Sequence, residues 1–336
     1  MLNIRPMSDR ASLHRIVERM AGVRVLCVGD VMLDHFIYGS VERISPEAPI
    51  PVLKVARESR MLGGAGNVAR NTTALGAEVS LIATVGDDDA GRAISQLVEQ
   101  QDRLNANFVV LHGRPTTVKT RYVAQGQQLL RADQERVGAP ATGDVQRLCE
   151  SIDREIGGAQ VLLISDYGKG AVSEAVAAHA VKAALKAGKP VVVDTKAGTL
   201  NAYRGASVIT PNARELAALT GGSASTDSEV EAAAMRLLAD FDIRAMVVTR
   251  SERGMSIVER GRPTVHLAAE AREVFDVSGA GDTVLALLAL SLAAGGDLSS
   301  AAALANVGAG IVVAKSGTAV VHPDELLRDF ARSGDK

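Results

Sequence analysis

Short apolar runs alternate with longer segments of helical character along most of the chain. The alternation predicts a mostly parallel sheet with helices on both faces. The last two helical segments are rich in Ala and Leu on every side and are therefore expected to be buried. Strands are expected at residues 23–28, 79–85, 108–111, 161–164, 191–193, 208–209 and 246–249, and helices at residues 65–75, 90–101, 173–187, 228–239, 283–294 and 298–314.

Two regions interrupt this rhythm. Residues 37–55 contain Pro46, Pro49 and Pro51, which exclude a regular helix there. Residues 116–131 alternate in polarity around a turn at Gly126, as a β-hairpin does. Together they predict a small antiparallel flap, or lid, with strands from residues 35–60 and 114–133. Because such a flap has an apolar face and open edges, it needs a partner surface: the substrate, the main domain or a second subunit.

Composition narrows the class of protein. The chain has 336 residues, 47% of them hydrophobic, and a formal net charge of -2. A large core is therefore possible, and a nucleic-acid-binding surface is not expected. Cys27 and Cys149 have no metal-binding or redox spacing and are expected to be reduced thiols, and the scattered histidines argue against a histidine-built metal site.

Domain organisation and location follow from what the sequence lacks. We find no repeat, linker or low-complexity tract, so residues 21–332 are expected to form one domain after an N-terminal extension at residues 1–20. The first 20 residues lack the apolar core of a signal peptide, and no run reaches the ~18 apolar residues of a membrane span. A cytoplasmic protein is expected.

The most specific motif is the loop of residues 276–283, Asp-Val-Ser-Gly-Ala-Gly-Asp-Thr, directly before a helical run. Gly279, Ala280 and Gly281 can bring backbone amides close to an anion at the start of the helix. Asp282 places a carboxylate inside that anion site. A general base that takes a proton from an attacking hydroxyl during phosphoryl transfer accounts for this placement. The alternative is a glycine-rich helix cap with an acidic residue favoured by the helix dipole.

A second glycine-rich site comprises Gly63, Gly64 and Asn67, where the amide of Asn67 could contact vicinal hydroxyls. No convincing strand is expected before it, and it lacks the G-x-G-x-x-G spacing of a dinucleotide site. Asp34 follows the first predicted strand, where ligands of parallel sheets gather, and could accept two sugar hydroxyls. A simple turn or cap explains either site about as well.

Four basic residues are candidates for holding an anionic group of the substrate. Lys119 and Arg121 lie two apart and share one face of the predicted hairpin. Lys169 and Lys196 each follow a predicted strand at the same edge of the sheet. The alternative is that all four are ordinary solvated cations.

Two further segments could lie beside a nucleotide. Asn212 and Glu215 begin a helix after a strand and could position metal-bound water, although the same spacing also describes a capping box. Thr249, Arg250 and Gly254 form a strand end and a tight turn. The Walker A motif and the protein-kinase motifs are both missing, so any phosphotransferase here belongs to neither class.

In this order the motifs resemble those of the ribokinase-like (PfkB) carbohydrate kinases, over residues 20–330. The resemblance implies a three-layer α/β/α sandwich with a small β lid. The segments at residues 29–34, 43–49 and 165–170 are most similar to the D-glycero-β-D-manno-heptose-7-phosphate kinases. Those enzymes phosphorylate the anomeric hydroxyl of their substrate on the way to ADP-heptose and the lipopolysaccharide core.

The resemblance also implies roles for individual residues. Asp282 matches the catalytic base, and residues 279–281 match the anion hole. ATP and Mg²⁺ are implied, with the metal held through phosphates and water near Glu215 rather than by direct protein ligands. The residues implied to contact the nucleotide are Asn212, Glu215, Thr249, Arg250, Gly254, Asp276, Gly279, Gly281, Asn306 and Gly308. Those implied to contact the sugar phosphate are Asp34, Gly63, Gly64, Asn67, Lys119, Arg121, Lys169, Lys196 and Asp282.

Expectations about partners come from the same source. A homodimer joined through the flaps is expected, and the chain is similar to the stand-alone form of the kinase, which implies a separate adenylyltransferase acting downstream. Two alternatives stay open: a ribokinase-like kinase for another sugar or sugar phosphate, and a non-catalytic regulator that binds a sugar or a nucleotide.

Overall fold

Nine strands form the central sheet of the computed structural model, which describes residues 10–196, 198–270 and 273–332. Their order is β13-β12-β11-β10-β9-β8-β1-β4-β5, and neighbours from β11 to β5 run parallel. Only β12 and β13 are antiparallel additions at one edge. The strands are β1 (Arg24–Gly29), β4 (Glu78–Gly86), β5 (Leu104–Leu111), β8 (Val161–Asp166), β9 (Val191–Thr195), β10 (Val208–Ile209), β11 (Ala245–Thr249), β12 (Met255–Glu259) and β13 (Val265–Leu267).

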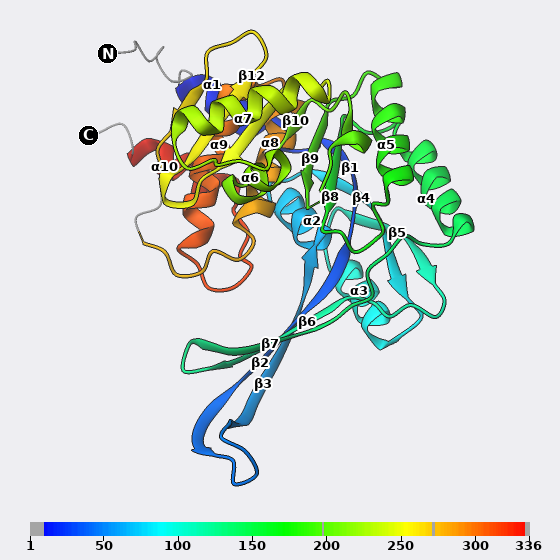
Figure 1. Ribbon diagram of the computed structural model, residues 1–336, viewed down its shortest axis with the longest axis vertical. Coiled ribbons are helices and arrows are strands. Elements are labelled where there is room, and N and C mark those ends of the chain that lie inside the picture. Colours follow the sequence, from blue (N-terminus) through cyan, green and yellow to red (C-terminus); the bar gives the residue numbers. More distant parts are fainter. Residues whose placement is uncertain (1–9, 197, 271–272, 333–336) are drawn as a thin grey trace.

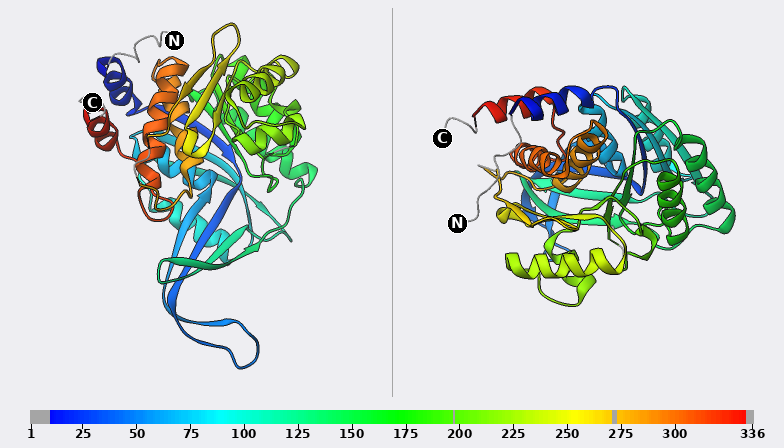
Figure 2. Two further views of the ribbon diagram at one scale, coloured as in Figure 1. Left: turned by 60° about the vertical axis from the view of Figure 1, so that its left-hand side comes forward. Right: turned by 90° about the horizontal axis from the view of Figure 1, so that it is seen from above.

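Helices cover both faces of this sheet, as expected (Figures 1 and 2). Alternate residues of a strand point to opposite faces, so Val25 and Cys27 of β1 join one core and Leu26 and Val28 the other. The first core is covered by α1 (Arg10–Met20), α2 (Ala65–Ala74), α3 (Asp89–Glu99), α8 (Ala280–Ala293), α9 (Leu298–Val313) and α10 (Pro323–Arg332). The second is covered by α4 (Thr142–Glu155), α5 (Glu174–Lys186), α6 (Ala213–Thr220) and α7 (Asp227–Asp240).

The flap is a separate four-stranded sheet that projects from the main body (Figure 1). Its order is β3-β2-β6-β7, from β2 (Val31–Ile44), β3 (Pro51–Gly64), β6 (Val118–Ala124) and β7 (Gln127–Gln134). The outer pairs are antiparallel, as the hairpin pattern predicts, but β2 and β6 run parallel. Strand β2 begins directly after β1 and β6 begins after β5, and both run outward from the main body.

Two elements depart from the sequence-based expectations. Strand β3 runs to Gly64, directly before α2, so the expectation of no convincing strand there was wrong. A polar run in its middle, Arg57-Glu58-Ser59-Arg60, hides the strand from an apolar pattern. Helix α1, within the predicted N-terminal extension, buries Leu13, Ile16, Val17 and Met20 in the first core; residues 1–9 of that extension lie outside the described part of the chain.

Among the described residues, no helix has both the length and the apolar character that crossing a membrane requires.

Candidate active site

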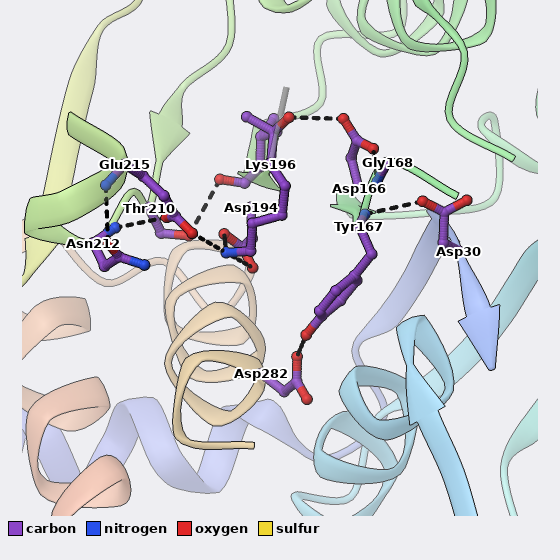
Figure 3. Close-up of polar contacts among 12 residues, drawn as sticks. Asp30, Asp166, Tyr167, Gly168, Asp194, Lys196, Thr210, Asn212, Glu215 and Asp282 are labelled. Atoms are coloured by element: carbon purple, nitrogen blue, oxygen red, sulfur yellow. Dashed lines mark hydrogen bonds and ion pairs between the residues drawn. The ribbon is translucent and has the colours of Figure 1, made fainter. Parts of the chain in front are cut away.

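Carboxylates from three neighbouring strands gather where those strands end, at the carboxyl side of the central sheet. Asp30 follows β1, Asp166 ends β8, and Asp194 lies near the end of β9. All three are buried, and the first turn of α8 lies opposite them (Figure 3). The carboxyl ends of parallel strands are the usual ligand site of open α/β sheets. Helix α8 also begins here, and a helix start leaves backbone amides free to bind a ligand.

The loop before α8 brings Asp282 into this edge. Gly279 adopts a left-handed conformation, with φ of 83°, just before the helix begins at Ala280. A Cβ at Gly279 would lie 2.8 Å from the Asn67 amide nitrogen, so only glycine fits against that side chain. Gly281 faces open space, and Asp282 is 5% exposed. Asp282 is therefore a buried carboxylate beside amides that a helix start leaves available.

Two side chains hold the Asp282 carboxylate. The Asn67 amide donates to Oδ2 at 2.6 Å, and the Tyr167 hydroxyl donates to Oδ1 at 2.6 Å (Figure 3). Burial raises the pKa of Asp282 to about 6, although both hydrogen bonds act in the opposite direction. Each carboxylate oxygen keeps a second lone pair for a substrate hydroxyl. A carboxylate with a raised pKa and free acceptor capacity fits a general base.

Asp34 lies within this site at the base of the lid. It is buried and pairs with Arg121 of β6, at 2.5 Å. A Cβ on Gly63 would come within 2.4 Å of Asp34 Oδ2, so the glycine makes room for the carboxylate. Gly64, with φ of 57°, then turns the chain into α2, which carries Asn67. The second glycine-rich segment thus positions both polar candidates.

Lys119 and Lys169 meet at a second position of the lid. Lys119 donates to Asp133 at 3.0 Å and lies 3.9 Å from Glu135, which binds Lys169 at 2.8 Å. The side chains of Lys119 and Arg121 are 15% and 14% exposed, which excludes the alternative of a solvated strand face. Three of the four candidate cations therefore lie in or beside the lid.

Lys196 lies apart from them. Its ammonium group is 2.7 Å from Glu215 and 3.2 Å from Asp194, and 5.9 Å from the centre of the Tyr167 ring (Figure 3). Burial raises the pKa of Asp194 to about 6, against the effect of Lys196. The structure thus places Lys196 among the residues expected at the nucleotide.

Asn212 and Glu215 form the capping box that was the alternative reading of their spacing. Asn212 Oδ1 accepts from the Glu215 amide at 3.0 Å, and Glu215 Oε2 accepts from the Asn212 amide at 2.8 Å. The second carboxylate oxygen of Glu215 binds Lys196. The cap fixes Glu215 at the strand edge, next to Thr249, which pairs with Asn212 as an isolated β-bridge.

The remaining nucleotide candidates are engaged in holding loops and helices. Arg250 is buried and binds Asp227 and Ser256, while the nearby Gly254 ends the short 3-10 turn. Asp276 accepts from the amides of Ser278 and Gly317, which shapes the loop before α8.

In α9, Asn306 donates to the Ala268 carbonyl at 2.7 Å. Gly308 lies where α9 packs on α8, against Leu287. These contacts give Arg250, Gly254, Asp276, Asn306 and Gly308 each a structural role. Their contact with a nucleotide stays a prediction.

Comparison with known proteins decides the family. The model of the "pfkB family carbohydrate kinase" matches residues 23–325. The chain belongs to the pfkB family of carbohydrate kinases. The kinase is therefore a phosphotransferase with an alcohol group as acceptor, and the resemblance seen in the motifs is confirmed.

Similar sequences and folds agree with this assignment. The kinase is 51% identical over 321 residues to "Bifunctional protein HldE" of Paramagnetospirillum magneticum, and 46% identical over 321 residues to that of Rhodospirillum rubrum. Each alignment covers 96% of the kinase but 66% and 65% of the relative, so the chain spans just under two thirds of their length.

Among solved structures, the fold is similar to Escherichia coli phosphofructokinase-2 in complex with potassium, with a TM-score of 0.78 and 20% identity over 93% of this chain and 99% of that one. Arabidopsis thaliana ribokinase complexed with ribose and ATP gives a TM-score of 0.70 and 18% identity, over 92% and 98% of the chains. The expected ribokinase-like α/β fold is confirmed.

The kinase has site residues that the sequence pattern did not identify. Tyr167 binds Asp282, Asp30 holds the loop that carries Tyr167, and Asp133 and Glu135 bind the lid cations. Tyr167 lies in a strand-end segment, which was a usable signal, but a tyrosine there has no characteristic spacing. In the sequence, Asp133 of β7 and Glu135 directly after it look like ordinary polar residues of an exposed strand.

No group of three or more His, Cys, Asp or Glu side chains is placed to hold a metal ion in the part of the kinase that the structure describes. Mg²⁺ keeps several waters and is often held by one or two carboxylates together with phosphates. The neighbouring oxygen donors of Glu215 and Asp194 fit that mode of binding.

Proposed function

We propose that this kinase transfers the γ-phosphoryl group of ATP to O1 of D-glycero-β-D-manno-heptose 7-phosphate. The product, the 1,7-bisphosphate, would lead to ADP-heptose and the lipopolysaccharide core. The observation that carries phosphoryl transfer is Asp282, a buried carboxylate of raised pKa at the start of α8. The heptose assignment is supported by the segments at residues 29–34, 43–49 and 165–170.

In this reaction Asp282 accepts the proton from the sugar O1 hydroxyl. The O1–phosphorus bond forms as the bond from the γ-phosphorus to the bridging oxygen of ADP breaks. The amides around Gly279 and Gly281 stabilise the charge that develops on the transferred group. Asp34 and Asn67 orient the sugar. Asn67 also orients Asp282, to which it donates a hydrogen bond.

When bound, ATP supplies the phosphoryl group and Mg²⁺ neutralises part of its charge. Glu215 and Asp194 would hold the metal through water, and Lys196 between them would bind a phosphate oxygen. This assignment moves Lys196 from the sugar phosphate to the nucleotide, because its carboxylate partners lie at the strand edge rather than in the lid.

The 7-phosphate would bind where Lys119 and Lys169 meet Glu135. Two cations with little exposure supply charge-assisted hydrogen bonds to phosphate oxygens. The phosphate would take the place of Asp133 and Glu135 as their partner. A sugar lacking this phosphate would leave those ion pairs as they are.

The proposal is tested by ADP release with Mg·ATP and four acceptors: heptose 7-phosphate, fructose 6-phosphate, ribose and adenosine. We expect turnover on heptose 7-phosphate alone. Replacing Asp282 with Asn should lower kcat about 10²- to 10⁴-fold, the usual contribution of a general base, while binding of the sugar phosphate persists.

Other outcomes separate the alternatives. Turnover on a different acceptor would keep the mechanism and overturn the heptose assignment. Near-normal turnover in the Asp282→Asn variant would remove Asp282 as the base. Measurable sugar or nucleotide binding with no turnover on any acceptor would instead support a non-catalytic regulator.

A further inference from the structure

The loop after β8 directs one side chain onto the proposed base. Tyr167 extends from this loop toward α8, and its hydroxyl lies 2.6 Å from Asp282 Oδ1 (Figure 3). Asn67 occupies the other carboxylate oxygen. With both oxygens bound, the plane of the carboxylate is fixed, and the remaining lone pairs have defined directions.

The loop itself is held by a buried carboxylate. Asp30 accepts hydrogen bonds from the amides of Tyr167 and Lys169, both at 2.9 Å, and of Ala171 at 2.7 Å. Asp30 is 2% exposed, so these amides replace the water that it lacks. One side chain after β1 therefore fixes the backbone from which Tyr167 reaches Asp282.

Tyr167 can act only as a neutral donor here. Burial and the neighbouring Asp282 raise the pKa of Tyr167 well above its usual value, so the phenol keeps its proton. A hydroxyl that donates to a carboxylate stabilises the charged form, which is the form that a base needs. Loss of this donor should make Asp282 harder to deprotonate.

Other groups near Asp282 act on its charge as well. Asp194 and Asp34 raise its pKa through their negative charge. Cys27 of β1, also buried, stays protonated because burial and the negative charge of Asp282 raise its pKa. Lys196 is the cation close to the Tyr167 ring. Among all these groups, Tyr167 and Asn67 are the hydrogen-bond donors recorded on the carboxylate.

We propose that Tyr167 is a positioning residue for Asp282, held in place by Asp30. It orients the carboxylate toward the acceptor hydroxyl and keeps it ionised near neutral pH, and it transfers no proton itself. The hydroxyl proton of the substrate goes to Asp282, while the Tyr167 O–H bond stays intact. This inference rests on the proposed function of Asp282.

The test is the Tyr167→Phe variant, which keeps the ring and removes the hydroxyl. Single-turnover phosphoryl transfer is measured from pH 5 to pH 9 with the acceptor that the wild type uses. We expect the acid limb of the rate to move up by about one pH unit, which is a tenfold loss below the limb. The KM of the acceptor should change less than about twofold, because Tyr167 acts through Asp282.

The matched control is Tyr203→Phe. Tyr203 donates its hydroxyl at 2.6 Å to Asp166, another buried carboxylate of the same strand edge. Its loss removes an equivalent hydrogen bond without touching Asp282, so the acid limb should stay at the wild-type pH even if the protein is less stable. A limb that moves equally in both variants would show a general structural effect and overturn the proposal.

A second readout does not depend on turnover. The carboxyl stretch of protonated Asp282, assigned by its loss in Asp282→Asn, is followed by infrared spectroscopy against pH. We expect its midpoint to be higher in Tyr167→Phe than in the wild type. An unchanged midpoint and rate profile would overturn the role of Tyr167. Absence of wild-type turnover with a shifted midpoint would instead overturn only the proposed function.

Discussion

At the scale of single residues, the site depends on carboxylates removed from water. Asp282 and Asp194 are both buried, and burial raises the pKa of each to about 6. Their environments differ, since neutral donors from Asn67 and Tyr167 bind Asp282, while the Lys196 cation binds Asp194. Such a difference in environment is how two carboxylates of similar pKa can take different roles. Asp282 can serve as the base, while Asp194 balances the charge of Lys196.

The rate should therefore depend on pH with a definite sign. Asp282 must be ionised to accept a proton, so kcat should fall as the pH drops through about 6. Replacing Asp194 with Asn removes a negative charge that raises the Asp282 pKa, so the acid limb should move to lower pH. A single-turnover pH profile checks both statements. A limb that moves upward in Asp194→Asn would contradict this electrostatic account.

At the scale of elements, strand β6 brings charge pairs into the lid. Strand β6 contributes Lys119 and Arg121, which pair with Asp133 of β7 and with Asp34 of β2. Because residues two apart on a strand share a face, both cations point to the same side of the lid sheet. The hairpin register thus decides which carboxylates the cations meet.

Replacing Lys119 with Ala tests the role of this strand. We expect the KM of the phosphorylated sugar to rise on the order of 10- to 100-fold, as for loss of a charged hydrogen bond, with little change in the KM of ATP. Arg131→Ala is the matched control, because Arg131 also binds Asp133 but is half exposed. Steady-state kinetics measure both variants; similar KM values in Lys119→Ala and wild type would place the phosphate elsewhere.

At the scale of the whole molecule, the lid projects away from the main body (Figure 1). Several of its apolar side chains are exposed. Ile44, Ile50, Val55 and Leu130 are each more than half exposed. Open strand edges beside such residues favour pairing with another copy of the sheet. A homodimer through the lids therefore stays our prediction.

Charging the lid should separate the two copies. We expect Ile50→Asp to convert a dimer into a monomer, as measured by light scattering coupled to size-exclusion chromatography. Leu185→Asp introduces the same charge at an exposed apolar residue of α5, in the main body, and should leave the mass unchanged. A wild-type protein that elutes as a monomer, or a dimer that Ile50→Asp does not disrupt, would refute the prediction.

The sequence by itself determined the architecture, because buried parallel strands read as short apolar runs between helices. It also singled out the glycine-rich loop with Asp282 as the candidate anion hole, because a carboxylate among glycines at a helix start is an unusual pattern. It predicted the lid hairpin, but it missed that β3 continues to Gly64, because the run Arg57-Glu58-Ser59-Arg60 is polar. Such local patterns predict which segments are buried and where the chain turns.

Only the tertiary structure decided which charges meet. Tyr167 and Asp282 are 115 residues apart in the chain, and Asn67 and Asp282 are 215 apart, so no local spacing could reveal their contacts. The fold likewise separated Lys196 from Lys119 and Lys169, although the sequence pattern makes all three candidates for one anionic group. Hydrogen bonds and ion pairs act over a few ångströms, and the folded chain alone sets which groups come that close.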